Sequence, residues 1–153
     1  MPILDLKTLI PKTSCTYPAP FDAPCRGRSS LRLSQDGGLS QFGANLVTLK
    51  PGAWSSQRHH HSAEDELVYI ISGTPTFIDD NGERVLGPGD VTAHPMGDGN
   101  GHHMINRTRE NVTFLVIGKS NPEHDHARYP DVDLDLPANG TKNRVFTSKE
   151  SSH

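Results

Sequence analysis

Three residues of the types that commonly bind metal ions in proteins lie close together in the sequence, namely His59, His61 and Glu66. Successive side chains of an extended strand point to opposite faces, so His59 and His61 would project to one side and His60 to the other. Glu66 stands at the head of the apolar, β-branched stretch 67–71, which is typical of a second strand. Where two such strands share a curved sheet, the imidazoles and the carboxylate face one volume. The stretch therefore predicts a metal site.

A fourth candidate ligand lies further along the chain. The Gly-Pro-Gly-Asp stretch 87–90 is typical of a turn that leads one strand into the next. Beyond this turn the sequence has two adjacent histidines, His102 and His103. We expect His102 to be the fourth ligand, with His103 as its alternative.

Three imidazoles and one carboxylate suit one divalent metal ion, either Fe, Mn, Ni, Co or Zn. Ligands on adjacent strands leave coordination positions open to water or substrate, and open positions are what make a metal site catalytic. Such an ion polarises a carbonyl, generates a hydroxide or binds a substrate oxygen beside O2. The alternative is a histidine cluster on an exposed loop that binds nothing. The spacings of Glu66 and His102 together favour metal binding.

The rest of the sequence predicts the strands that would position these ligands. Hydrophobic residues make up only 33% of the chain while Gly and Pro are plentiful, which favours many short strands joined by turns over a helical bundle. Asn81-Gly82 marks a tight hairpin turn. Strands are expected in stretches 30–34, 41–50, 67–71, 74–86 (a hairpin), 91–94, 102–108 and 111–118.

The 153 residues are expected to form one domain with two extensions. Residues 1–30 are interrupted by prolines and predict an irregular N-terminal arm. Residues 31–120 are expected to form the β-barrel domain. Residues 121–153 predict a polar C-terminal extension that is partly disordered and wraps the surface.

The two histidine clusters resemble the paired motifs of the cupin superfamily. The first family motif has a glycine, a His-x-His pair, a glutamate and a closing glycine, which match Gly52, His59, His61, Glu66 and Gly73. The second motif is a series of glycine, proline, glycine, histidine and asparagine, which matches Gly89, Pro95, Gly97, His102 and Asn106. The resemblance covers about residues 42–119. It implies an all-β fold, the cupin-type double-stranded β-helix or jelly-roll barrel.

Two spacings depart from the family pattern. Six residues separate Gly52 from His59 where the family usually has five, and this difference affects only a turn. Four residues separate Gly97 from His102 where the family usually has two. The second departure leaves His103 as the alternative ligand, although the three-residue step from His102 to Asn106 favours His102.

The resemblance implies a metal-dependent enzyme that acts on a small oxygenated organic molecule, first of all an Fe(II)-type dioxygenase. A non-redox isomerase or lyase acting on a sugar or a hydroxy or keto acid is the second candidate, and a non-catalytic metal- or ligand-binding module is the third. A phosphosugar enzyme would need clustered Lys and Arg near the ligands, and only Arg58 lies close in sequence. Arg32 and Arg107 are the other candidate anion binders. The resemblance also implies a homodimer, joined through edge strands or swapped arms, unless the arm folds back on its own barrel.

Composition excludes several other classes of function. The formal net charge is −3 with both signs scattered, which indicates neither a nucleic-acid partner nor a membrane surface. No apolar run is long enough to cross a bilayer and the N-terminus lacks signal-peptide features, so we expect a cytoplasmic protein. In that reducing compartment Cys15 and Cys25 are expected to be free thiols, with a structural disulfide as the alternative.

The remaining polar residues near the motifs are expected to be structural or solvated. His94, by alternation, lies outside the ligand face and is expected to be a partly buried core residue. His124 and His126 are expected to be solvated. Glu64 and Asp65 predict a solvated acidic loop, with the alternative that one of them orients a ligand histidine.

Overall fold

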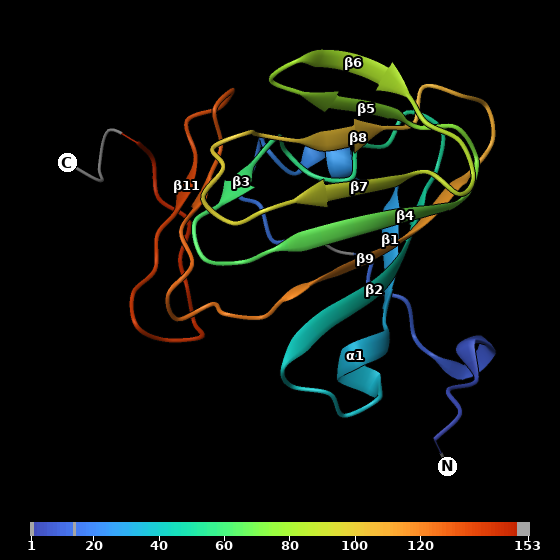
Figure 1. Cartoon of the computed structure of the whole chain (residues 1–153), viewed down its shortest axis with the longest axis horizontal. Coiled ribbons are helices and arrows are strands. Elements are labelled where there is room, and N and C mark those ends of the chain that lie inside the picture. Colours follow the sequence, from blue (N-terminus) through green and yellow to red (C-terminus); the bar gives the residue numbers. More distant parts are fainter. Residues whose placement is uncertain (1, 14, 150–153) are drawn as a thin grey trace.

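The computed structural model describes residues 2–13 and 15–149 (Figure 1). The chain begins with an arm that contains two short 3-10 helices, η1 (Leu6–Thr8) and η2 (Ala23–Cys25). Lys12 in this arm pairs with Ser30 through two backbone hydrogen bonds of 2.8 and 3.0 Å, so the arm lies against its own barrel. None of the helices in the described part of the chain is long and apolar enough to cross a membrane.

One wall of the barrel is a five-stranded antiparallel sheet in the order β1-β2-β9-β4-β7. Its strands are β1 (Arg28–Arg32), β2 (Phe42–Leu49), β4 (Glu66–Ser72), β7 (Val91–His94) and β9 (Val112–Lys119). The short helix α1 (Leu33–Asp36) connects β1 to β2. Strand β9, far from β2 and β4 in sequence, lies between them, which is a crossover connection typical of jelly rolls.

The opposite wall is a three-stranded sheet in the order β6-β5-β8, drawn above the larger sheet in Figure 1. It consists of β5 (Thr76–Asp79), β6 (Gly82–Val85) and β8 (His103–Ile105). Apolar side chains from both sheets form the core between them, among them Val47, Ile70, Met104 and Phe114. The all-β jelly-roll prediction is confirmed.

Alternation along β4 decides which side chains enter the barrel. Val68 and Ile70 are buried in the core, whereas Leu67, Tyr69 and Ile71 on the other face are 41 to 45% exposed. Because side chains alternate along a strand, Glu66 shares the inner face with Val68 and Ile70. The predicted ligand at the head of β4 therefore points into the barrel.

The C-terminal residues form a second, smaller core with the N-terminal arm. Strands β10 (Ala127–Arg128) and β11 (Asp135–Leu136) join β3 (His60–His61) in a three-stranded sheet in the order β11-β10-β3. Buried Tyr129 and Leu134 pack against Tyr17 and Phe21 of the arm. Residues 121–149 thus contact the strand that carries the first histidine cluster. Residues 150–153, part of the predicted disordered end, lie outside the described residues.

Candidate metal centre

Local backbone pairing brings the two histidine clusters together. His59 pairs with His102 as an isolated antiparallel bridge, with backbone N···O distances of 2.9 and 3.2 Å. His61 belongs to β3, and Glu66 begins β4 after a short loop. Three separate segments of the chain therefore present their side chains to the same end of the barrel.

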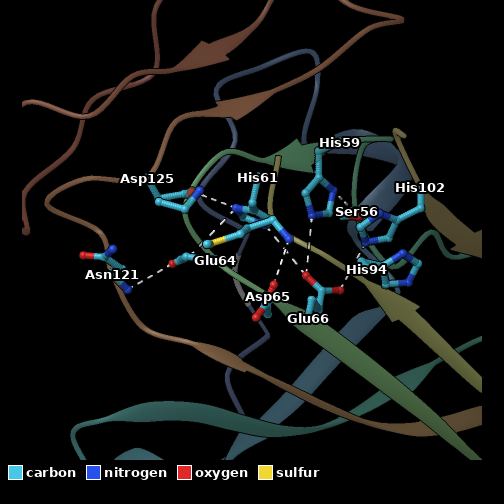
Figure 2. A network of polar contacts seen from close by, with 12 residues as sticks. Ser56, His59, His61, Glu64, Asp65, Glu66, His94, His102, Asn121 and Asp125 are labelled. Carbon is cyan, nitrogen blue, oxygen red and sulfur yellow. Dashed lines mark hydrogen bonds and ion pairs between the residues drawn. The ribbon is translucent and has the colours of Figure 1, made fainter. Parts of the chain in front are cut away.

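The three predicted histidine ligands converge on the carboxylate of the fourth, Glu66, as Figure 2 shows. The Nε2 atoms of His59 and His61 lie 3.9 and 3.7 Å from Oε2 of Glu66. The Nε2 atom of His102 lies 3.3 Å from Oε1 of the same residue. Ligand atoms of His59, His61 and Glu66 all lie within 4.8 Å of one another, which is close enough for one ion to contact them together.

Hydrogen bonds hold the first two imidazoles in the tautomer that a metal ligand needs. The Nδ1 atom of His59 lies 2.9 Å from the backbone oxygen of Gln57, which can only accept, so Nδ1 donates. The Nδ1 atom of His61 likewise donates to the carboxylate of Asp125 at 2.7 Å. In both rings the Nε2 lone pair is left facing Glu66, and this arrangement fits a divalent ion.

The protonation states of His59 and Glu66 also fit a site for a divalent ion. Burial lowers the pKa of His59 to about 3, so its imidazole is neutral at neutral pH. Burial opposes ionisation of Glu66, but its hydrogen bond with His102 and the neighbouring imidazoles lower its pKa to about 2. At His61, burial favours the neutral ring, but the hydrogen bond with Asp125 and the nearby carboxylates raise its pKa above the ordinary value, so a metal ion would have to displace a proton there. Imidazoles beside an ionised carboxylate are the donor set that Fe(II), Mn(II), Ni(II), Co(II) and Zn(II) accept.

Asp125 is a site residue that the sequence did not reveal. It is fully buried, and besides His61 it accepts a hydrogen bond from the backbone N of Ala63 at 3.0 Å. Its carboxylate also contacts Arg144 at 3.3 Å. Burial opposes its ionisation, but these contacts, the one with His61 first, lower the pKa of Asp125 below its ordinary value. The run His124-Asp125-His126 was the only sequence signal, and polar runs of this kind are usually solvated.

The prediction that His94 lies outside the ligand face is wrong. Its ring stacks on that of His102 with centroids 3.4 Å apart and planes 7° from parallel (Figure 2). The residue is only 8% exposed, and its Nε2 atom lies 2.9 Å from Oγ1 of Thr92. The register of β4 and β7 places His94 directly opposite Glu66, and residues opposite each other in a sheet share a face.

Of the two adjacent histidines, His102 is the one that approaches Glu66. His103 is turned toward Ser56, whose backbone oxygen accepts from its Nδ1 atom at 2.9 Å, and it contacts the edge of Trp54. The Nδ1 atom of His102 is buried without a hydrogen-bond partner among the described residues. Stacking on His94 therefore helps to orient the His102 ring, whereas a hydrogen bond at Nδ1 orients the rings of His59 and His61.

Both acidic residues before β4 accept backbone hydrogen bonds; Asp65 is exposed as predicted, whereas Glu64 is half-buried. Oδ1 of Asp65 accepts a hydrogen bond from the backbone N of Met96 at 2.8 Å. Oε2 of Glu64 accepts from the backbone N of Asn121 at 3.2 Å, while its Oε1 lies 3.9 Å from Nδ1 of His61. Asp125, at 2.7 Å, is the closer acceptor for His61. His126, also predicted to be solvated, is half-buried and pairs with Asp135 at 2.7 Å.

Three of the candidate ligands, His59, Glu66 and His102, line a cavity of about 220 Å³ inside the barrel, whereas His61 does not. Its walls are mixed: Phe77, Met104 and Phe114 are apolar, whereas Arg28 and Asn45 are polar. Met104 and Phe114 line it, whereas Phe42 lies outside on the sheet surface and is 43% exposed. A small organic molecule fits such a space beside the ligands.

Three comparisons relate the chain to known proteins. Residues 45–118 match the family model described as Cupin domain. A sugar phosphate isomerase from a cupin superfamily of Silicibacter pomeroyi is 45% identical, with 97% of this chain and 94% of that chain covered and a TM-score of 0.90. A putative sugar phosphate isomerase from Acidithiobacillus ferrooxidans is 28% identical over 82% of this chain and 80% of that chain, with a TM-score of 0.74.

More distant structures share the fold alone. The polyketide cyclase RemF from Streptomyces resistomycificus is 17% identical over 79% of this chain and 80% of its own, with a TM-score of 0.66. A search of curated proteins finds no match. The identity and coverage of the Silicibacter pomeroyi protein, together with the domain match, establish the family. This chain belongs to the cupin superfamily.

Proposed function

We propose that this cupin binds one divalent metal ion through His59, His61, Glu66 and His102 and acts as a non-redox isomerase or lyase on a small oxygenated substrate. The observation that carries the proposal is the convergence of three imidazoles on a half-buried carboxylate at the wall of a cavity inside the barrel. The reaction class is supported by the relative of 45% identity, which is named a sugar phosphate isomerase.

The residues of this chain supply binding and proton transfer. A bound divalent ion polarises a carbonyl or hydroxyl oxygen of the substrate. His103 lines the cavity, and because its Nδ1 atom donates to Ser56, its Nε2 atom carries a lone pair that can take a proton. Burial lowers the pKa of His103, which keeps the ring neutral at neutral pH. The apolar side chains of Phe77 and Phe114 exclude water from the same space.

The test combines metal analysis with a substrate screen. Protein purified without a histidine tag should contain close to one divalent ion per chain, measured by elemental analysis. Sugars, sugar phosphates and hydroxy or keto acids should then be screened with and without O2, and turnover should persist without O2. His61→Ala and Glu66→Gln should lose metal and turnover, whereas the neighbouring His60→Ala should keep both. Metal-free wild-type protein or a strict O2 requirement contradicts the proposal.

An Fe(II)-type dioxygenase is the second candidate. The observation that favours it is the apolar part of the cavity, where Phe77, Met104 and Phe114 lie beside the three histidines. Stoichiometric O2 consumption by the iron-loaded protein would identify it. Stabilisation by a ligand without any product would instead identify a non-catalytic binding module.

We also propose a homodimer that buries the outer face of the five-stranded sheet. This face carries exposed apolar side chains on four neighbouring strands, namely Phe42, Leu67, Tyr69, Ile71, Val91 and Ile117. Monomeric soluble proteins rarely expose contiguous apolar patches of this kind. Light scattering should give the mass of a dimer, and Tyr69→Lys should reduce it to that of a monomer. Val145→Lys, also on an exposed residue, should leave the dimer intact; a monomeric wild type contradicts the proposal.

A further inference from the structure

Two of the arginines that the sequence suggested for anion binding already have carboxylate partners. Arg58 donates two hydrogen bonds of 2.8 Å to Asp131 and also pairs with Asp80. Arg107 donates to Glu83 at 2.6 and 3.1 Å. Their charges are therefore balanced by the protein itself, and neither residue lines the barrel cavity.

Arg28 differs from both. It lies in β1 directly opposite the fully buried Leu49 of β2, and it shares the inner face of the sheet with buried Ser30. Its side chain lines the cavity that contains the candidate metal ligands. Among the described residues, no carboxylate forms an ion pair with Arg28, and its Nε atom is buried without a hydrogen-bond partner.

An unpaired cation inside a barrel is energetically unfavourable. Burial lowers the pKa of Arg28, which means that the surroundings disfavour its charged form. Structures retain such a group at a cost in stability, and the cost is recovered when an anion pairs with it. Among the described residues that line this cavity, Glu66 is the only carboxylate. It lies close to three histidines and forms no ion pair with Arg28.

A second cavity adjoins the first and adds another cation. This second cavity has a volume of about 300 Å³. It shares Arg28, Ser55, Ser56 and His59 with the cavity that contains the candidate metal ligands, and Lys12 of the N-terminal arm also lines it. The structure gives the Lys12 side chain no ion pair in the described residues, and no Asp or Glu of that described part lines the second cavity. The second cavity is therefore large enough for a small anion, and two positively charged residues, Arg28 and Lys12, line it.

We propose that Arg28 and Lys12 bind the anionic group, a phosphate or a carboxylate, of the substrate whose oxygenated end reaches the metal site. The planar guanidinium of arginine matches both oxyanions with paired hydrogen bonds. The Oγ atom of Ser55 accepts from the backbone N of Met104 at 2.8 Å, so its hydroxyl proton is free to be donated to the same anion. This assignment of the substrate class rests on the proposed function, but the anion site itself requires no metal.

The experiment measures anion binding to the metal-free protein, so that a failure of metal chemistry cannot affect it. Inorganic phosphate and succinate are titrated separately by calorimetry, and the tighter of the two identifies the group. Arg28→Gln should weaken that binding at least about tenfold, the loss expected for a charge-assisted pair. Lys12→Gln should weaken it by a smaller factor. Arg26→Gln is the matched control, because its side chain is 74% exposed.

A stability measurement separates binding from a structural role. Without anion, Arg28→Gln should unfold at the same temperature as the wild type or a higher one, because it removes an unpaired charge that is partly buried. Added anion should raise the unfolding temperature of the wild type and not that of the variant. Equal anion affinity in wild type and Arg28→Gln, absence of binding of both anions to the wild type, or a lower unfolding temperature of anion-free Arg28→Gln would each overturn the proposal.

Discussion

The carboxylate of Asp125 lies 2.7 Å from Nδ1 of His61, although the two residues are 64 positions apart in the sequence. The contact fixes the tautomer and the orientation of one candidate metal ligand. It also couples the C-terminal extension to the barrel, because the same aspartate accepts from the backbone N of Ala63 and from Arg144. The extension is therefore part of the site.

Replacing Asp125 should weaken metal binding without removing a ligand. In Asp125→Asn the amide still accepts from His61 but carries no charge, so His61 becomes a weaker base and its ring is held less firmly. We expect a loss of metal affinity of about 10- to 100-fold, measured by Co(II) titration against a competing chelator. Asp36→Asn, on the exposed part of α1, is the matched control and should bind as the wild type does. Unchanged affinity in Asp125→Asn would show that the contact does not support the metal.

His94 should make the metal-free protein sensitive to mild acid. Burial, and then the neighbouring His102, lower the pKa of His94 to about 4, so the folded state excludes a proton that the unfolded chain takes up near pH 6.5. The free energy of unfolding therefore falls as pH decreases from 6.5 to about 4, by at most about 1.4 kcal/mol per pH unit for this group. In His94→Phe this slope should be smaller.

The slope is measured by chemical unfolding at a series of pH values. His124→Phe, at an exposed position, serves as the control and should leave the slope unchanged. Identical slopes in wild type and His94→Phe would mean that His94 is as easily protonated in the folded protein as in the unfolded chain.

The small core between the two extensions should contribute measurably to stability. Leu134 is 2% exposed and packs with Ala127 and Tyr129 and against residues of the N-terminal arm. Leu134→Ala should lower the free energy of unfolding by about 2–4 kcal/mol, because it removes buried methyl groups and leaves a cavity. Leu39→Ala, at a position 52% exposed, should change it by less than about 0.5 kcal/mol. Equal values for the two variants, obtained by urea unfolding, would argue against a packed extension.

Asn106 should stabilise the barrel rather than take part in chemistry. Its Nδ2 atom donates to the backbone oxygens of Leu49 and Glu110 at 2.9 and 2.7 Å, and its Oδ1 atom accepts from Thr108. Asn106→Ala leaves these buried groups unpaired, so we expect a loss of about 2–4 kcal/mol in unfolding free energy. Asn139→Ala, at an exposed position, is the control. A stable Asn106→Ala protein that has lost only turnover would place Asn106 in the reaction instead.

The strands and the spacing of the histidine clusters were predictable because both depend on local periodicity. Alternation within one strand places His59 and His61 on one face and Glu66 with Val68, and the structure shows this arrangement. The same reasoning was wrong for His94, because the phase of one strand relative to another depends on the register between β4 and β7. Register is decided by pairing across the sheet.

From the amino-acid sequence alone, strand alternation and turn chemistry predicted the strands, because both are local properties. The resemblance to the cupin motifs then implied a jelly-roll barrel with three histidines and a glutamate available for a metal. Only the tertiary structure decided what surrounds them. Asp125 and Arg28 come from the segments after and before the motifs. Asp125 reaches His61 through the pairing of β10 with β3, and Arg28 reaches the cavity through the pairing of β1 with β2. The physical reason is that burial and electrostatic pairing are contacts between distant segments, which no local pattern records.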